Sequence, residues 1–119
     1  MFEISWRDSD TIAVVTLDNP PANALGLRQI EELDHLLDRF SGNDTLRAVI
    51  FRTRSRFFSA GADISLMGES MSFPDGPDRM ADLCRKMQAT FAKLEHLEVP
   101  TLAAISGICV GGGLELALA

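Results

Sequence analysis

The sequence contains no tyrosine, a single tryptophan and only two cysteines in 119 residues. Two cysteines cannot build the disulfide framework of a small secreted domain, and Cys84 and Cys109 lack the spacing of a metal site. We therefore expect both to be buried, reduced thiols.

No apolar run approaches the ~20 residues that a membrane-spanning helix needs, and Met1 precedes acidic, strand-like sequence instead of a basic and apolar leader. These absences predict a cytoplasmic protein that has no membrane as a partner.

Positive charge is also scarce. Eleven lysines and arginines stand against 17 aspartates and glutamates, so the net charge is -6. Such a chain lacks the basic face that nucleic acid phosphates require, and nucleic acid is not an expected partner. A small anionic ligand can still bind at a helix N-terminus or a local basic cluster. Arg52, Arg54 and Arg56 would form such a cluster on one side of an extended segment, and a solvent-exposed strand face is the alternative.

The residues that are present, 46% hydrophobic and 24% charged, have the composition of one globular domain or a piece of one. Apolar patterns predict four strands and three helices in the order hairpin, helix, strand, helix, strand, helix, which indicates an α/β fold. The strands are expected at residues 2–7, 11–17, 46–53 and 101–106, the last two of them buried. The helices are expected at residues 27–40, 80–97 and 114–119. Residues 57–77, rich in glycine, serine and proline, are predicted to form a long loop.

Residues 106–119 read SGICVGGGLELALA, in which three consecutive glycines precede a helix with one carboxylate, Glu115. A glycine costs a helix about 1 kcal/mol relative to alanine, so three at a helix start indicate that the backbone approaches another group closely. The N–H groups of such a helix start can hold negative charge. Glu115 follows Gly111 and Gly112 by one turn, so it can move a proton on a ligand whose carbonyl becomes an enolate there. The alternative is a tight packing turn in which the glutamate favours the helix dipole.

Three segments together carry a resemblance to a known family. "NPPANAL", "FFSAGADI" and "AAISGICVGGGLELALA", in this order and spacing, closely resemble the enoyl-CoA hydratase/isomerase family, also called crotonases. The resemblance implies an α/β fold of the ClpP/crotonase type, a spiral of β-β-α units that is incomplete at the C-terminus. It implies that residues 1–119 are the N-terminal part of a single crotonase-like domain. It also implies that the full-length protein is a homotrimer or a dimer of trimers.

The same resemblance implies the site residues. In the family, two backbone N–H groups bind the thioester carbonyl in an oxyanion hole, and here they would be those of Ala62 and Gly112. The "AGAD" turn also contacts coenzyme A, so Ala60, Asp63 and Ile64 are expected to line the path of the substrate. The same path would also pass Ala22 and Ala24 of the earlier loop.

Family hydratases add water to a 2-enoyl-CoA thioester with the help of a glutamate at the position of Glu115, which predicts a catalytic role for it in fatty acid or related acyl-CoA metabolism. They use a second glutamate from a later segment, which these 119 residues do not include. No metal and no cofactor besides the coenzyme A of the substrate is expected. An isomerase or a C–C cleaving enzyme of the same family, or a non-catalytic fragment, are the alternatives. One departure is Ser65, which stands where many members have a lysine near the coenzyme A phosphates.

Overall fold

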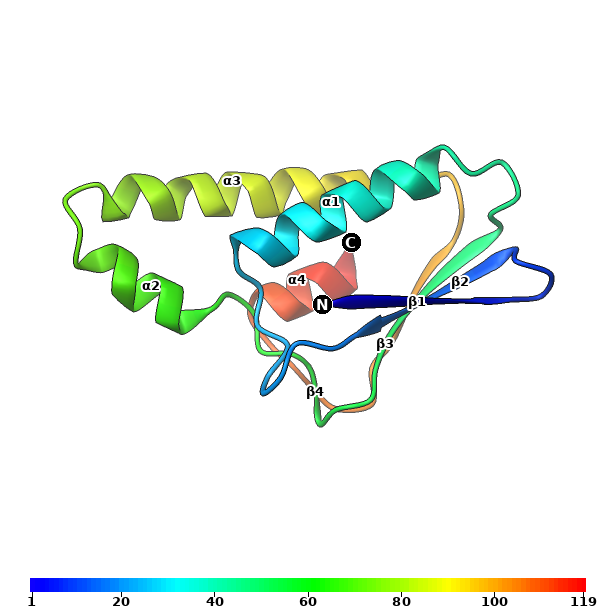
Figure 1. Ribbon diagram of the computed structural model, residues 1–119, viewed down its shortest axis with the longest axis horizontal. Coiled ribbons are helices and arrows are strands. Elements are labelled where there is room, and N and C mark those ends of the chain that lie inside the picture. Colours follow the sequence, from blue (N-terminus) through cyan, green and yellow to red (C-terminus); the bar gives the residue numbers. More distant parts are fainter.

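The computed structural model describes residues 1–119, apart from the side chain of Leu66. It contains six strands and four helices, arranged in layers with the longest helices on one side of the strands (Figure 1). The strands are β1 Phe2–Arg7, β2 Ile12–Leu17, β3 Ala48–Thr53, β4 Phe57–Ser59, β5 Thr101–Ala104 and β6 Ile108–Cys109. The helices are α1 Leu27–Ser41, α2 Ile64–Met71, α3 Gly76–Glu95 and α4 Gly112–Leu118.

The main sheet has the strand order β1-β2-β3-β5, and it begins with the predicted hairpin. β1 and β2 are antiparallel, with Phe2 opposite Leu17. Asp8, Ser9 and Asp10 turn the chain between them in left-handed conformations, which aspartate tolerates better than most residues. β2, β3 and β5 then run parallel, and each crossover between them contains a helix.

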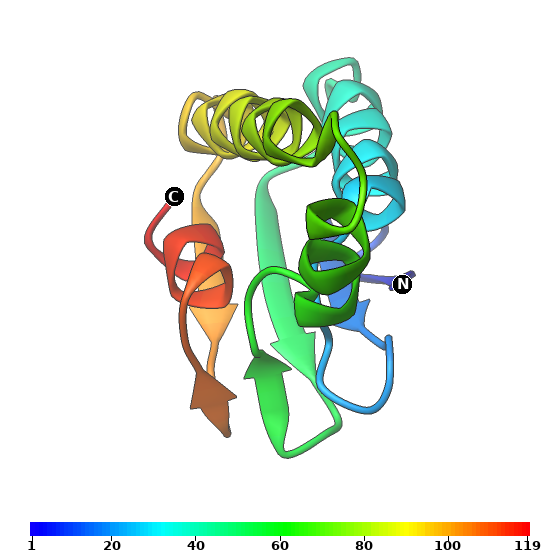
Figure 2. The same cartoon turned by 90° about the vertical axis from the view of Figure 1, so that its left-hand side faces the viewer.

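A second sheet consists of two parallel strands, β4 and β6. β4 follows β3 and β6 follows β5, and β4 and β6 pair in parallel just as β3 and β5 do. Each pair of strands is then followed by helix, α2 and α3 in one case and α4 in the other. The predicted succession of β-β-α units is therefore present, and Figure 2 shows α4 beside the strands while α1 and α3 lie across one end of the view.

The core lies between the main sheet and the helices α1 and α3. One face of the central strands is buried and mostly apolar, with Ala13, Val15 and Val49 at 0% exposure. The apolar stripe of α1 packs on this face, as its periodicity predicted. Trp6 adds an edge-to-face contact with Phe40, at 6.3 Å between ring centroids.

The prediction of a long loop at residues 57–77 is wrong. The segment forms β4, the helix α2 and the start of α3. Glycine and serine have low helix propensity, but a cap stabilises the start of α2. The carboxylate of Asp63 accepts a hydrogen bond from the N–H of Ser65 at 2.9 Å. Packing of α2 against α3 supplies the rest of the stability, since an isolated helix of this length is marginal.

Two burial predictions are also wrong. The segment after α3 forms β5, but it lies at the edge of the main sheet and Leu102 is 52% exposed. Cys84 is exposed on α3, and Cys109 is half-buried, although both are free thiols. Partial burial raises the pKa of the Cys109 thiol.

Across the described residues, the structure contains no helix with the length and apolar character needed to cross a membrane.

Candidate active site

The first turn of the candidate site follows β4 and is tied to the loop before α1. Leu25 forms a parallel bridge with Ala62. The N–H of Leu25 donates to the carbonyl oxygen of Gly61 at 2.8 Å, and its own carbonyl accepts from the N–H of Asp63 at 3.1 Å. Because the two neighbours of Ala62 make these bonds, the N–H of Ala62 itself faces away from Leu25. Gly61 has a φ of 90°, the left-handed region in which glycine is favoured.

The second turn, between β6 and α4, lies directly against the first. Gly111 has a φ of 53° and precedes Gly112, the first residue of α4. A methyl group added to Gly61 would lie 2.8 Å from the nitrogen of Gly112, and one added to Gly112 would lie 3.6 Å from the nitrogen of Ala62. This approach is the reason for the glycine at position 61, because a side chain there would push the two turns apart.

The structure thus brings together Ala62 and Gly112, the two residues whose N–H groups the family resemblance implies as donors. Within the part of the chain that is described, neither the N–H of Ala62 nor that of Gly112 donates a hydrogen bond to another residue. Both residues are half-buried, so an atom of a ligand can reach them. A pair of unpaired N–H groups at a helix start is able to bind an oxygen that carries negative charge.

The residues expected along the coenzyme A path line one hollow beside the first turn, with a volume of about 380 Å³. They are Ala22, Ala24, Ala60, Asp63 and Ile64. Ala62 lines it as well, and so does Ser65, which stands where many members of the resembled family have a lysine. Asp63 has a structural task besides, since its carboxylate caps α2. Contact of these residues with coenzyme A remains a prediction.

Glu115 does not line this hollow. It is exposed and lines a second hollow, of about 440 Å³, between α3 and α4. Gln88, Phe91 and Glu95 contribute to the same hollow from α3. Ala62 lines the first hollow, and Gly112 begins the helix α4 that carries Glu115. The predicted base and the predicted coenzyme A path therefore line two different hollows.

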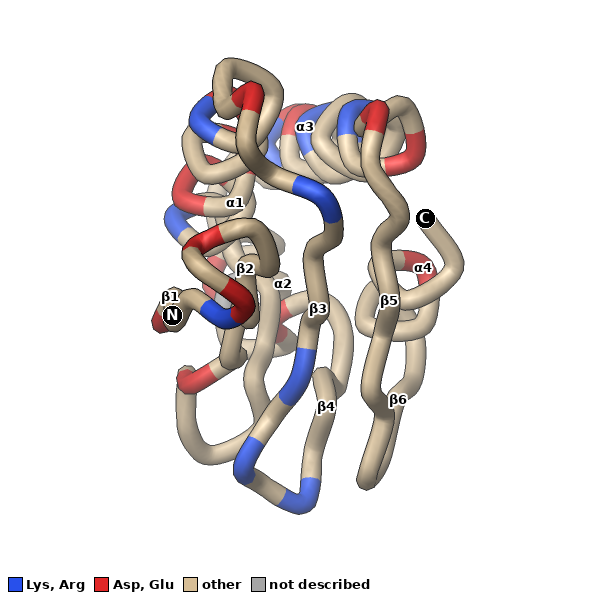
Figure 3. The backbone as a smooth tube through the Cα atoms, turned by 90° about the vertical axis from the view of Figure 1, so that its right-hand side faces the viewer, with Lys and Arg blue, Asp and Glu red and all other residues tan. Residues whose placement is uncertain are grey.

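The segment that carries the three arginines is extended only in part, so their spacing of two does not by itself put them on one side. β3 ends at residue 53, and the chain bends between Arg52 and Arg56, where the Lys and Arg positions gather at the end of β3 (Figure 3). Arg54 pairs with Glu3 at 2.9 Å, and Arg56 lies over the ring of Phe57 with 5.2 Å to the ring centroid. Among the described residues that line the hollow of about 380 Å³, none is an arginine.

Sequence reasoning missed two buried polar residues next to the first turn, Asn23 and Ser59. Asn23 is 2% exposed and Ser59 is 0% exposed. Both contact the segment that carries Ala62 by hydrogen bonds. An asparagine between two alanines in "PPANAL" was a signal for a left-handed position, and it has a φ of 50°.

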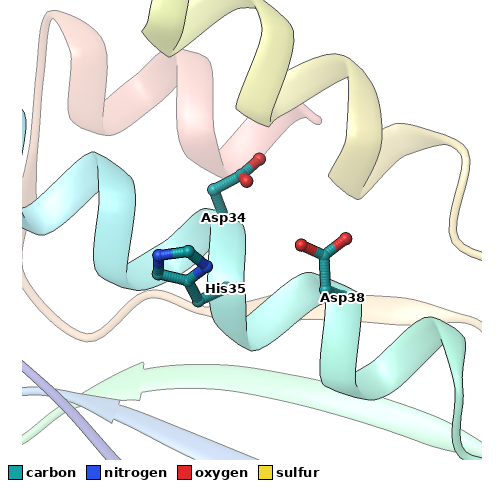
Figure 4. A group of neighbouring side chains, drawn as sticks. All are labelled: Asp34, His35 and Asp38. Carbon is teal, nitrogen blue, oxygen red and sulfur yellow. The ribbon is translucent and has the colours of Figure 1, made fainter.

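Among the described side chains, one group of potential metal ligands lies close together on α1: Asp34, His35 and Asp38 (Figure 4). The ammonium of Lys93 already pairs with two of them, at 3.0 Å from Asp34 and 2.6 Å from Asp38. The hydrogen bond to Asp38, together with Asp34, raises the pKa of Lys93 against the opposing effect of burial. The cluster is thus an ion-pair link between α1 and α3, and we assign it no metal.

Comparison with known proteins identifies the family of the chain. The model of the family described as enoyl-CoA hydratase/isomerase matches residues 7–119. The protein named "Probable enoyl-CoA hydratase" of Bacillus subtilis (strain 168) is 40% identical over 119 residues, which cover 100% of this chain and 45% of that protein. An indene-carboxyl-CoA hydrolase of Rhodococcus jostii (strain RHA1) is 41% identical over 113 residues, 94% of this chain and 42% of that protein.

The solved structure of an enoyl-CoA hydratase from Bacillus anthracis superposes with a TM-score of 0.86 at 28% identity, over 98% of this chain and 44% of that one. The chain therefore spans less than half the length of the relatives it matches. Over that length it has the α/β fold of crotonase structures. The chain belongs to the enoyl-CoA hydratase/isomerase family, the crotonases.

Proposed function

We propose that the protein adds water to the double bond of a 2-enoyl-CoA thioester. The observation that carries the proposal is the pair of unpaired, adjacent N–H groups of Ala62 and Gly112. Addition of water to a conjugated thioester passes through an enolate, whose oxygen carries the negative charge. Donors that are already in position for this charge stabilise the transition state, and each contributes about 3–4 kcal/mol in comparable enzymes.

Glu115 is proposed as one of the two carboxylates that move protons in this reaction. It lies one turn along α4 from Gly112, so a substrate carbonyl held at the two N–H groups would have its double bond near the carboxylate. Its exposure to the hollow between α3 and α4 leaves room for water. The second carboxylate is proposed to come from a segment that these 119 residues do not contain, as in family hydratases.

The coenzyme A part of the substrate is proposed to lie along the hollow of about 380 Å³ beside Ala62. The relatives from Bacillus subtilis and Rhodococcus jostii are named for reactions of CoA compounds, which supports this substrate class. Their reactions differ, and hydration is preferred here because a carboxylate is present at Glu115. The reaction as proposed uses no cofactor besides the coenzyme A of the substrate, and a trimer or a dimer of trimers is the proposed assembly.

The test is replacement of the carboxylate by an amide of the same shape. In the protein expressed from its whole coding sequence, Glu115→Gln should lower kcat at least 100-fold, within the range of general acid–base catalysis, and should leave the affinity for a saturated acyl-CoA nearly unchanged. Turnover is followed as loss of the absorbance of the conjugated thioester. Glu95→Gln is the matched control, since Glu95 lines the same hollow, and it should retain activity. Wild-type turnover in the Glu115 variant would remove this residue from the mechanism.

A further inference from the structure

The side chain of Asn23 connects the loop before α1 to β4. Its amide nitrogen lies 2.9 Å from the carbonyl oxygen of Phe57 and 3.1 Å from that of Phe58. Its Oδ1 accepts a hydrogen bond from the backbone N–H of Asn19 at 2.7 Å, which closes the loop on itself. At 2% exposure these bonds are shielded from water, so each group left unpaired would be costly.

Ser59, the last residue of β4, continues this network toward the candidate site. Its hydroxyl donates to the backbone carbonyl of Asn23 at 2.7 Å and accepts a hydrogen bond from the N–H of Gly61 at 3.1 Å. Its backbone carbonyl accepts from the N–H of Val110 at 3.1 Å. Ser59 also fills the space beside Gly113, because a methyl group on that glycine would lie 2.6 Å from its Cβ.

One fully buried serine therefore contacts all three segments that form the site. These are the loop with Asn23, the turn with Gly61 and Ala62, and the glycine run that begins α4. The two N–H donors belong to the second and third of these segments. Ser59 thus contacts both segments that carry these N–H groups, although it does not itself line the hollow of about 380 Å³.

We propose that Ser59 and Asn23 are positioning residues that fix the distance between the N–H groups of Ala62 and Gly112. The proposal rests on the proposed function, because it assigns to the network the task of keeping the two donors in place for an enolate oxygen. Deletion of the Ser59 hydroxyl removes the acceptor of the Gly61 N–H and the donor to Asn23, so the first turn can shift. A shift of a fraction of an ångström is enough to weaken stabilisation of a transition state.

The test compares Ser59→Ala with Thr90→Val in the protein expressed from its whole coding sequence. Both changes delete one buried hydroxyl, but Thr90 lies on α3, with its hydroxyl 3.5 Å from Asp34 of α1. Ser59→Ala should lower kcat about 10-fold with little change in KM, whereas Thr90→Val should leave both unchanged. A second readout is the ratio of affinities for a 3-oxoacyl-CoA, bound as its enolate, and a saturated acyl-CoA. This ratio should fall about as much as kcat in the Ser59 variant alone.

A Ser59 variant with the kcat and the affinity ratio of the Thr90 variant overturns the proposal. If the wild-type protein prefers the enolate but does not hydrate a 2-enoyl-CoA, the proposed reaction fails while the affinity ratio still tests the positioning role. Asn23→Gly provides a second route if Ser59→Ala does not fold, because glycine accepts the φ of 50° and keeps the backbone carbonyl. It should lower kcat and the affinity ratio in the same direction, and unchanged values in that variant also overturn the proposal.

Discussion

The packing of α4 on β4 can be tested with one methyl group at Gly113. An alanine Cβ at this position would lie 2.5 Å from the carbonyl oxygen of Ser59, 2.6 Å from its Cβ and 2.8 Å from its Oγ. Ordinary contacts of a Cβ atom are 3.4–4 Å. Two of the three opposing atoms belong to the backbone or are attached directly to it, so they cannot swing aside, and α4 has to move.

The expected cost follows from two opposing effects. Alanine is favoured over glycine within a helix by about 1 kcal/mol, but less at the second residue of α4, and overpacking costs about 1–3 kcal/mol. Gly113→Ala should therefore lower the free energy of unfolding by on the order of 1–2 kcal/mol. Gly68→Ala is the control with the opposite sign. It lies within α2, where the added methyl meets no described atom within 4 Å, so it should stabilise the protein by up to about 1 kcal/mol.

Both variants are compared with the wild type by urea unfolding and by the midpoint of thermal unfolding. A change of 1 kcal/mol corresponds to about 2–4 °C for a domain of ~150–250 residues. If Gly113→Ala is as stable as Gly68→Ala, the close approach of the two elements at Ser59 is refuted. If a folded Gly113→Ala variant hydrates enoyl-CoA at the wild-type rate, the positions of the N–H groups of Ala62 and Gly112 do not depend on the contact between Gly113 and Ser59.

Three further predictions follow from single contacts. Gly112→Pro should abolish turnover, because proline lacks the N–H group. Gly112→Ala should reduce turnover less, because its only close contact is with the end of the Met87 side chain. A folded, active proline variant would show that the carbonyl is bound elsewhere. Burial opposes ionisation of Glu32, but hydrogen bonds from the N–H of Phe2 and from the Met1 ammonium outweigh it and lower the pKa of this carboxyl group from 4.5. The ionised carboxylate therefore stabilises the fold above pH 4.5. This stabilisation is lost as the pH falls through the lowered pKa. Unfolding of Glu32→Gln should thus differ from wild type at neutral pH and converge with it in acid, and a constant difference would contradict this. The isolated 119 residues should be inactive and self-associate, because Leu102 and other large apolar side chains of β5, β6 and α4 are exposed. Light scattering that shows a monodisperse monomer, together with activity of that monomer, would refute this prediction.

Elements with strong periodicity could be predicted from the sequence, and those stabilised by distant contacts could not. The helix α1 has an apolar residue at almost every third or fourth position, and the structure buries that stripe. By contrast, α2 contains serine and glycine and depends on the Asp63 cap and on packing against α3. The burial of β5 was overestimated since an apolar strand has the same pattern at the centre of a sheet as at its edge.

At the candidate site, the sequence by itself determined which residue types are available. The glycines at 61 and 111 permit positive φ, Glu115 follows one turn into a helix, and the spacing of three segments indicates the family. The family resemblance implied that the N–H groups of Ala62 and Gly112 are neighbours, but only the tertiary structure shows how they meet. The two turns are some 50 residues apart, and the parallel pairing of β4 and β6 brings them together. The hydrogen bonds of Asn23 and Ser59 could likewise not be read from the sequence, since a buried hydrogen bond depends on partners that folding alone brings within reach.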